Sequence, residues 1–486
     1  MKRIITALLA LTMLFLVVSC AKQPTSNNKP SGVTDEQLEE LDGKKWDKHE
    51  LDFEGYEFVI LGKAKIGSAK GWGGDDLNID QLTGDSVLDE VYNRNRLIEQ
   101  TYNCIITSVE SADIKTTVMA GSEKDGNMIS YTMWNVFQLL ESGFLLDLRD
   151  PRLTYLNLDK SWYNQSILAD TTIAGKTCII NGDMLFTDNN ALWITMFNKE
   201  LAAQYIPDVN LYDLVKEGKW TVDRFMQYAK LATKEIVADD KMDWNDQWGY
   251  TGQSSNIEAF MVASGCRYAA VTADGGIETY VFTEKFREIF LKCFESVDHS
   301  FCIMESDIDG VANQWSAMLS IFPAGRALFS VSSMSDVLGH REMEMDFGVL
   351  PNPKLTEDQT EYYTWVTMNT NVVALPYYCE NFERTSAIME ALFEESSYSL
   401  RGAYIDRALK YQATRDDESI EMIDIIMERP VYDIGFIYNF GGLQGTLSQL
   451  IKKRAVSSLS STIKKAESKV NQDITTLLTT LGYYKT

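Results

Sequence analysis

The segment from Tyr56 to Thr107 constrains the fold most, because it reads as a strand, a helix and a second strand. Residues 56–61 are rich in strand-forming side chains and alternate in polarity. Ser86 is placed to cap a helix that runs to about Tyr102, and residues 104–107 again favour a strand. A strand, a helix and a strand in series build a sheet with right-handed crossovers. The sequence therefore predicts an α/β protein.

Later segments continue the α/β pattern. Short apolar runs predict further strands at residues 177–180, 192–197, 347–351 and 371–376. Thr221 is expected to be the N-cap of a helix, and a helical periodicity from residue 446 to residue 481 predicts a helix in one or two pieces. Nothing repeats with a fixed period, which excludes solenoids and propellers.

The first twenty residues decide the cellular compartment. Two basic residues precede an apolar run of 15 residues, 4–18, which is shorter than the roughly 20 that a membrane-spanning helix needs. Ser19 and Cys20 follow, so residues 1–19 are predicted to be a lipoprotein signal peptide and Cys20 the lipidation site. An ordinary cleaved signal with a coincidental cysteine is the alternative. Residues 20–50 are polar and expected to be a flexible tether, so the chain is expected at the cell surface, lipid-anchored to the outer face of the cytoplasmic membrane.

Charge and rare residue types exclude several functions. The chain has 45 Lys and Arg against 70 Asp and Glu, a formal charge of −25 that becomes −27 once the leader is removed. A nucleic-acid partner is not expected, because phosphate binding needs a basic surface. With three His residues, a multi-histidine metal site is not expected, and because no dinucleotide or phosphate loop occurs, no cofactor is predicted. Irregular spacing leaves both disulfides and buried free thiols open for Cys104, Cys178, Cys266, Cys293, Cys302 and Cys379.

Six short motifs occur in the order found in one family of exported proteins. They are residues 143–148 (Gly-Phe-Leu-Leu-Asp-Leu), 197–201 (Phe-Asn-Lys-Glu-Leu), 218–225 (Gly-Lys-Trp-Thr-Val-Asp-Arg-Phe), 323–329 (Pro-Ala-Gly-Arg-Ala-Leu-Phe), 347–353 (Phe-Gly-Val-Leu-Pro-Asn-Pro) and 431–439 (Val-Tyr-Asp-Ile-Gly-Phe-Ile-Tyr-Asn) with Gly441 and Gly442. Each motif alone recurs by chance, but together they cover nearly the whole mature chain. The sequence resembles the bacterial extracellular solute-binding proteins of the family 1 type, which are the lipid-anchored substrate-binding components of carbohydrate-type ABC importers.

The resemblance implies a two-lobed periplasmic-binding-protein-like fold of type II, with a hinge and a ligand cleft between the lobes. By analogy, the N-terminal lobe is expected to comprise residues 51–178 plus 348–395, and the C-terminal lobe residues 179–347 plus 396–486. Chain crossings are expected near residues 178–196, 347–351 and 394–401. The implied function is to capture a carbohydrate, a neutral mono- or oligosaccharide, and to deliver it to ABC permease subunits in the membrane. The protein itself is expected to be a monomer.

Sugar recognition needs flat apolar faces for the rings and converging polar groups for the hydroxyls. Aromatic and amide or carboxylate side chains at expected strand ends, crossings and open loops are therefore the candidates. The predicted ligand-binding residues are Trp72, Trp134, Asp183, Asp188, Trp193, Trp365, Asn369, Tyr438 and Asn439. The alternative for most of them is structural packing, where large aromatic side chains usually lie. Trp220 is assigned to the core instead, because its motif reads as the start of a helix.

A metal site, an enzyme and a surface adhesin or sensor are the alternatives to a binding protein. Residues 235–246 resemble a calcium loop, but Val237 cannot ligate and Asp240 replaces the glycine of the sharp turn, so no metal is predicted. No nucleophile-elbow, zinc-protease or phosphate-loop motif occurs, so the chain is not expected to be an enzyme. A surface adhesin or sensor, and less favourably a glycan-acting enzyme that uses a pair of acids, remain as alternatives.

Overall fold

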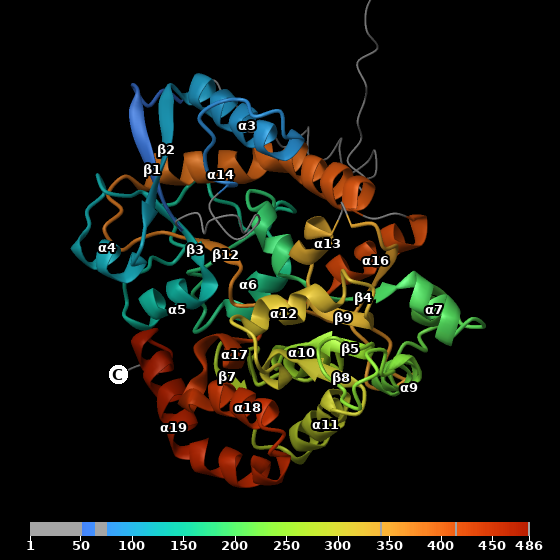
Figure 1. Cartoon of the computed structure of the whole chain (residues 1–486). Coiled ribbons are helices and arrows are strands. Elements are labelled where there is room, and N and C mark those ends of the chain that lie inside the picture. The colour runs from blue at the N-terminus through green and yellow to red at the C-terminus, as the bar shows by residue number, and fades with distance from the viewer. Residues whose placement is uncertain (1–50, 64–74, 341–342, 414–415, 485–486) are drawn as a thin grey trace, which may run out of the picture. The chain divides into compact units, whose positions relative to one another are not determined.

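The computed structural model describes residues 51–63, 75–340, 343–413 and 416–484 (Figure 1). The predicted signal peptide, the tether, the lipidation site at Cys20 and the candidate Trp72 lie outside these residues. Within the described part, no helix is both long and apolar enough to pass through a bilayer.

A four-stranded sheet of order β12-β3-β1-β2 contains the first predicted strands. Strand β1 is parallel to both of its neighbours, β2 and β3. Strand β12 forms one edge of the sheet and is antiparallel to β3. The strands are β1 (Tyr56–Lys63), β2 (Cys104–Ser111), β3 (Met128–Thr132) and β12 (Asn371–Ala374). The predictions at residues 56–61, 104–107 and 371–376 are confirmed as strands. In contrast, the run at 177–180 forms only a single bridge, between Ile180 and Val373 of β12.

A five-stranded sheet of order β10-β4-β9-β5-β8 lies in the second half of the fold. Its strands are β4 (Trp193–Asn198), β5 (Trp248–Gly252), β8 (Cys302–Met304), β9 (Ala327–Ser333) and β10 (Phe347–Leu350). The antiparallel pairs β10·β4 and β4·β9 stand beside the parallel pairs β9·β5 and β5·β8. The strands predicted at 192–197 and 347–351 are confirmed. Two minor two-stranded sheets are formed by β6 (Ala269–Val271) with β7 (Ile277–Thr279), and by β11 (Thr364–Trp365) with β13 (Pro430–Val431).

Helices cover both sheets, and α3 packs beside α14 on the first (Figure 1). The α-helices are α3 (Ser86–Tyr102), α4 (Ile114–Ala120), α5 (Met133–Glu141), α6 (Gln165–Thr171), α7 (Lys199–Tyr205), α8 (Leu211–Lys216), α9 (Val222–Ala232), α10 (Ser255–Ala263), α11 (Glu284–Phe294), α12 (Gln314–Ile321), α13 (Ser335–Gly339), α14 (Phe382–Tyr398), α15 (Leu400–Gly402), α16 (Asp417–Glu428), α17 (Ile434–Tyr438), α18 (Leu443–Lys452) and α19 (Leu459–Thr480). The shorter turns are η1 (Phe186–Ala191), η2 (Glu295–Val297), η3 (Glu305–Asp307), η5 (Phe440–Gly442) and η6 (Val456–Ser458), and η4 (Ala403–Ala413) is a π-helix.

Local chemistry explains where two of the predicted helices begin. The N-cap of α3 is Asp85 rather than the predicted Ser86, because the Asp85 carboxylate accepts hydrogen bonds from the first backbone N–H groups of the helix. At α9 the expected N-cap is confirmed, since the Thr221 hydroxyl accepts from the backbone N–H of Arg224. The periodicity between residues 446 and 481 forms two helices, α18 and α19. Trp220 is fully buried and donates its indole N–H to the Pro351 carbonyl, as expected of a core residue.

The chain crosses between the sheets at identifiable segments. Ile180 pairs with the first sheet and Trp193 begins a strand of the second, so the first crossing lies at residues 181–192, inside the expected range. The second crossing lies later than the expected 347–351. Because β10 still pairs with β4, the passage falls between the end of β10 and the start of β12. The boundary expected at residue 348 therefore falls within a strand of the second sheet, and the other lobe limits stay predictions.

The six cysteines of the described chain are all buried as free thiols, which is one of the two states that their spacing allows.

Candidate ligand-binding cleft

A cavity of about 1200 Å³, here called the cleft, is lined by elements of both sheets. One wall comes from the end of β1 and the start of α3, and the other from β5, β9, α12 and α13. Residues of η1 add to the lining, and so do four residues of the second crossing, Trp365, Thr367, Met368 and Asn369. The segments that build the cleft are thus far apart in the sequence, and both crossings contribute to it. A concave site at such a junction is where small ligands usually bind.

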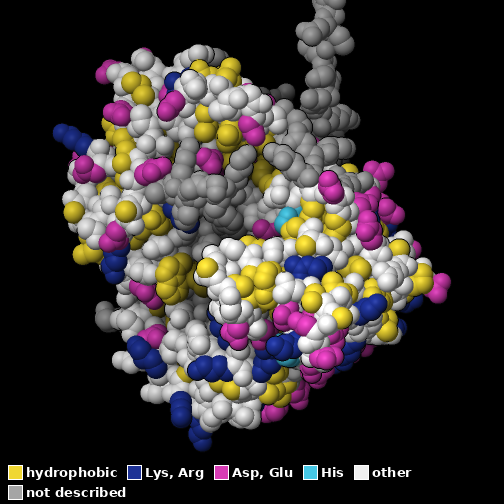
Figure 2. Space-filling model, in the orientation of Figure 1, with side chains coloured by type: hydrophobic (Ala, Val, Ile, Leu, Met, Phe, Trp, Pro, Cys, Tyr) yellow, Lys and Arg dark blue, Asp and Glu magenta, His cyan; other side chains and the backbone are white. Residues whose placement is uncertain are grey.

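Aromatic side chains supply the apolar surface of the cleft. The rings of Trp193 and Trp365 lie with their centroids 5.0 Å apart and tilted by 45°, and Phe436 meets Trp365 edge-on at 4.8 Å. Trp315 and Leu319 are 42% and 39% exposed, although both are large apolar residues that line the cleft. Both belong to α12, where Figure 2 shows apolar side chains gathered at the surface. A bare indole at the mouth of a cavity offers a flat face to a ring.

Hydroxyl groups and amides supply the polar surface of the cleft. Eight Ser and Thr residues line it: Ser86, Thr251, Ser255, Ser330, Ser332, Ser333, Ser335 and Thr367. Four amides join them: Asn190, Gln253, Asn369 and Gln444. Two of the lining polar atoms, Trp193 Nε1 and Thr251 Oγ1, are buried without a hydrogen-bond partner among the described residues. Because buried polar groups in folded proteins nearly always find a partner, these two atoms are suited to a bound molecule or an ordered water.

The charged groups of the lining are mostly acidic. The described lining contains one lysine, Lys63, and three acids, Asp75, Asp85 and Asp336. Burial lowers the pKa of Lys63 and raises the pKa of Asp336. One partly desolvated lysine against three acids makes the cleft a poor site for an anion and leaves a neutral, hydroxyl-rich molecule as the better fit.

Several predicted site residues lie in the first crossing. Asp183 forms an ion pair with Arg401, whose Nε lies 3.3 Å from Asp183 Oδ1, and burial raises the pKa of Asp183 to about 7. Asp188 is 6% exposed, and its Oδ1 has no hydrogen-bond partner among the described residues. Burial and the nearby Asp183 hold the pKa of Asp188 well above its ordinary value. Neither carboxylate lines the cleft; both belong to a polar network beside it.

The network continues onto the first sheet through Asp76 and Arg94. The Thr187 hydroxyl donates to Asp76 Oδ2, and burial raises the pKa of Asp76 to about 6. Arg94 is 2% exposed, and its guanidinium donates to the carbonyls of Asp76 and Met184. The charged groups Asp76 and Arg94 are therefore tied to uncharged groups of the first crossing in a buried environment.

The remaining predicted site residues divide into two groups. Trp193, Trp365 and Asn369 line the cleft. Trp134 is half-buried at the start of α5, where its backbone N–H donates to Met368, and Tyr438 packs edge-on against Phe137 at 4.6 Å. Neither of these aromatic residues lines the cleft.

Asn439 ends α17 in a left-handed conformation, with φ at 50°, and its Oδ1 accepts from the backbone N–H of Gln444. Ligand contact by any of these candidates stays a prediction.

The sequence did not single out Trp315, Thr251 or the serines of β9. Trp315 follows Asn313 and Gln314 in a polar context, which is the signal that an exposed indole leaves in a sequence. The run Ser330-Val-Ser-Ser333 directly after the motif at 323–329 could also have been noticed, because alternate serines on a strand face one side.

The acidic loop at residues 235–246 is organised by its own hydrogen bonds. Asp246 Oδ1 accepts from the backbone N–H groups of Ile236 and Val237, and Asp246 Oδ2 accepts from that of Asp243. Among the described residues, no group of three or more His, Cys, Asp or Glu side chains is placed to hold a metal ion.

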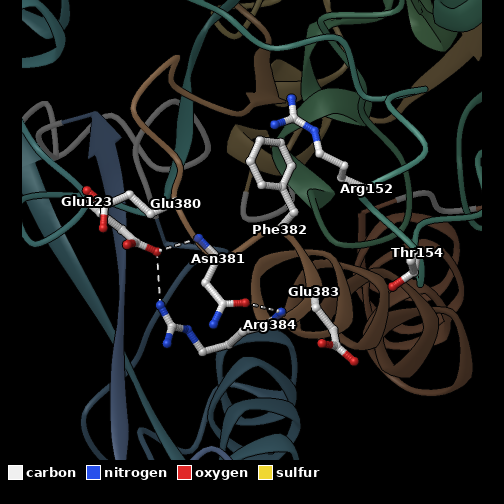
Figure 3. A pocket seen from close by; sticks show the side chains of 8 residues that line it. All are labelled: Glu123, Arg152, Thr154, Glu380, Asn381, Phe382, Glu383 and Arg384. Atoms are coloured by element: carbon white, nitrogen blue, oxygen red, sulfur yellow. Dashed lines mark hydrogen bonds and ion pairs between the residues drawn. The ribbon is translucent and has the colours of Figure 1, made fainter.

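A second, more open hollow of about 720 Å³ lies at the start of α14 (Figure 3). Its two arginines are already engaged by neighbouring side chains. Arg384 donates to Glu123 at 2.9 Å and lies 3.3 Å from the centroid of the Tyr56 ring. The Arg152 guanidinium covers the Phe382 ring at 3.8 Å. This hollow is therefore a packed surface feature, and the cleft is the better candidate for ligand binding.

No family model and no curated protein matches the sequence, whereas solved structures match the fold. A substrate-binding protein of an ABC transporter from Listeria monocytogenes, in complex with cycloalternan, is 14% identical, covers 86% of this chain and 98% of its own, and has a TM-score of 0.52. A protein from Arthrobacter globiformis that binds cyclic α-maltosyl-1,6-maltose is 13% identical over 86% and 99% of the two chains, with a TM-score of 0.55.

A family 1 extracellular solute-binding protein from Bifidobacterium longum subsp. infantis is 13% identical over 85% and 99%, with a TM-score of 0.52. At this identity the likeness concerns the fold, and it agrees with the six ordered motifs. The chain has the two-lobed α/β fold of the carbohydrate-binding extracellular solute-binding proteins of ABC importers.

Proposed function

We propose that the chain is the substrate-binding lipoprotein of an ABC importer, which captures a neutral mono- or oligosaccharide in the cleft and delivers it to the permease. The observation that carries the proposal is the cleft lining, where indole faces stand among hydroxyl and amide groups. A sugar presents C–H faces to aromatic rings and hydroxyls to polar side chains. The ligands named for proteins of the same fold, cycloalternan and cyclic α-maltosyl-1,6-maltose, are neutral carbohydrates of this chemistry.

The mechanism of ligand capture that we propose depends on the two walls of the cleft, because each wall is built on a different sheet. A sugar that touches only Trp315 and the β9 serines uses half of the available contacts. If the lobes rotate about the crossings, the α3 side adds its contacts as well. Ligand therefore shifts an open–closed equilibrium toward the closed form, because only that form offers both sets of contacts. The permease would distinguish the closed, loaded protein from the open one, and the transport energy would come from a separate ATPase.

Anchoring completes the proposal. A lipid-modified Cys20, with residues 20–50 as a tether, would hold a monomeric binding protein at the outer face of the cytoplasmic membrane, close to its permease. Mass spectrometry of the protein purified from membranes would test this step. An unmodified N-terminus, or cleavage at another residue, would refute it.

The binding step is tested by calorimetry of the mature chain against a panel of mono- and oligosaccharides. The informative variant is Trp315→Ala, because Trp315 is 42% exposed and its loss leaves the core intact. Loss of one stacking face is expected to weaken binding about tenfold, equivalent to about 1.4 kcal/mol, with no change in melting temperature. The matched control is Tyr484→Ala, since Tyr484 is 49% exposed and lies outside the cleft lining.

Two outcomes would contradict the proposal. Binding of peptides with no response to any sugar would remove the carbohydrate assignment. Release of a shortened or hydrolysed glycan during the titration would favour the enzyme alternative.

A further inference from the structure

The C-terminal helices carry a charge opposite to that of the chain. Residues 443–484 contain six Lys and Arg residues and two acids, whereas the whole chain has a formal charge of −25. The basic residues are Lys452, Lys453, Arg454, Lys464, Lys465 and Lys469. Figure 2 shows Lys and Arg side chains gathered at the lower end of the molecule, where Figure 1 places α18 and α19.

Part of this charge is neutralised by ion pairs and part is not. Lys452 pairs with Glu305 at 3.1 Å, and Arg454 holds Asp307 with both of its terminal nitrogens. Lys453, Lys464 and Lys465 are exposed and form no ion pair with a described residue. Lys469 is also exposed and pairs with Asp473 on its own helix. We call Lys453, Lys464, Lys465 and Lys469 the basic face.

Packing of α19 fixes the direction of the basic face. Ile463, Val470 and Leu477 are 2%, 1% and 3% exposed, so this stripe of the helix is bound to the core. With 3.6 residues per turn, Lys465 falls opposite this stripe and Lys464 and Lys469 fall on its two flanks, so all three lie outside the packed side of the helix. Neither of the two cavities described above includes any of these lysines. The arrangement offers an exposed set of positive charges rather than a pocket for one small anion.

We propose that the basic face docks on the anionic headgroups of a phospholipid bilayer. This step rests on the proposed function, because a lipid anchor would keep the domain beside such a surface. The charge of the rest of the chain would hold it away from the membrane. The four lysines would therefore select one orientation, with α19 toward the bilayer and the cleft wall formed by α3 on another side of the molecule (Figure 1).

Salt screening allows the basic face to attract an anionic membrane even though the whole protein is acidic. At about 0.1 M salt the Debye length is about 10 Å, so acids beyond that distance from α19 are largely screened. A lysine near an anionic membrane strengthens binding by about fivefold. The effect of several lysines on one face is therefore measurable even for a weakly bound domain.

The test is sedimentation of the unlipidated mature chain with vesicles. Vesicles of equal parts phosphatidylglycerol and phosphatidylcholine are expected to bind the protein, and pure phosphatidylcholine vesicles are not. The combined variant Lys453→Gln, Lys464→Gln and Lys465→Gln should reduce the partition coefficient at least tenfold, at about fivefold per fully engaged lysine. The control variant Lys124→Gln, Lys234→Gln and Lys241→Gln changes the same charge at exposed lysines that belong to neither α18 nor α19, and should retain binding within about twofold.

Three results would overturn the proposal: equal loss in the control variant, equal binding to neutral vesicles, or full displacement by inorganic phosphate. The first would indicate an effect of net charge, the second an apolar contact, and the third a site for isolated anions. Sugar calorimetry on the same variants keeps the two proposals separate. The lysine variant should bind sugar as the unaltered chain does, so a failure of membrane docking leaves the cleft assignment standing.

Discussion

Asn in place of Asp188 should make the protein more stable at alkaline pH and leave it unchanged in acid. Asp188 is 6% exposed, and its Oδ1 lacks a partner among the described residues. Burial and the neighbouring Asp183 raise its pKa well above the ordinary value of 3.8. The folded state therefore favours the protonated form, while the unfolded chain ionises freely above pH 4 or so.

The sign of the pH effect follows from that difference. Below the unfolded pKa of 3.8 both states are protonated and Asp188 carries no penalty. As the pH rises toward the folded pKa, the unfolded state gains from ionisation and the folded state does not. The unaltered chain thus loses at most about 1.4 kcal/mol of stability per pH unit from this group. Asn cannot ionise, so Asp188→Asn removes this slope.

Avoiding an unpaired buried carboxylate is expected to be worth about 1–3 kcal/mol at pH 8. In a chain of this length, that corresponds to about 1–3 °C in melting temperature, because the unfolding entropy grows with residue number. Scanning calorimetry at pH 5 and pH 8 measures it, with Asp358→Asn as the control because Asp358 is an exposed acid. A variant that is less stable at both pH values, or that keeps the pH slope, would show that Asp188 is satisfied when ionised.

Two further predictions concern packing. Arg94→Met should lower the free energy of unfolding by about 3–5 kcal/mol in urea titrations, because the buried guanidinium satisfies several backbone carbonyls that would lose their donor. A loss below about 1 kcal/mol would mean that water replaces the guanidinium. Gly249→Ala should abolish soluble expression or lower the melting temperature strongly, since a Cβ there would lie 1.9 Å from the Ala229 carbonyl oxygen. Gly339→Ala is its control, because a Cβ there meets nothing within 4 Å, and equal behaviour of the two variants would contradict the steric argument.

The first sheet could be predicted from the sequence because its strands are long and regular. Tyr56–Lys63 and Cys104–Ser111 each have 8 residues, which is enough for a strand pattern to show. β8 has 3 residues, and β5 contains two glycines in five, so neither carries a strand pattern. These strands exist because neighbouring strands pair with them, β9 with β5 and β5 with β8, and no local pattern records that.

The site was less predictable than the fold for a related reason. Trp193 and Trp365 line the cleft, as a search for aromatic side chains near the expected crossings suggests. Tyr438 is predicted to contact ligand on the same grounds. It instead packs against Phe137, which lies far away in the sequence, and it does not line the cleft. Whether an indole or phenol ring is covered depends on such distant partners. Trp315 is 42% exposed because no described residue covers it on α12, and the sequence around it does not show this.

The first crossing joins ligand recognition to the buried charges. Phe186 and Asn190 of the turn η1 line the cleft, and Asp188 between them faces the buried network instead. Tyr404 also lines the cleft and donates its hydroxyl to Asn190 Oδ1. A ligand that presses on Phe186 or Asn190 therefore acts on the same six-residue turn that holds Asp188. If the hydroxyl-rich lining contacts the ligand as proposed, while the ionisation of the carboxylates affects the turn, a change in pH should alter the ease of closing more than the contacts made once the cleft has closed.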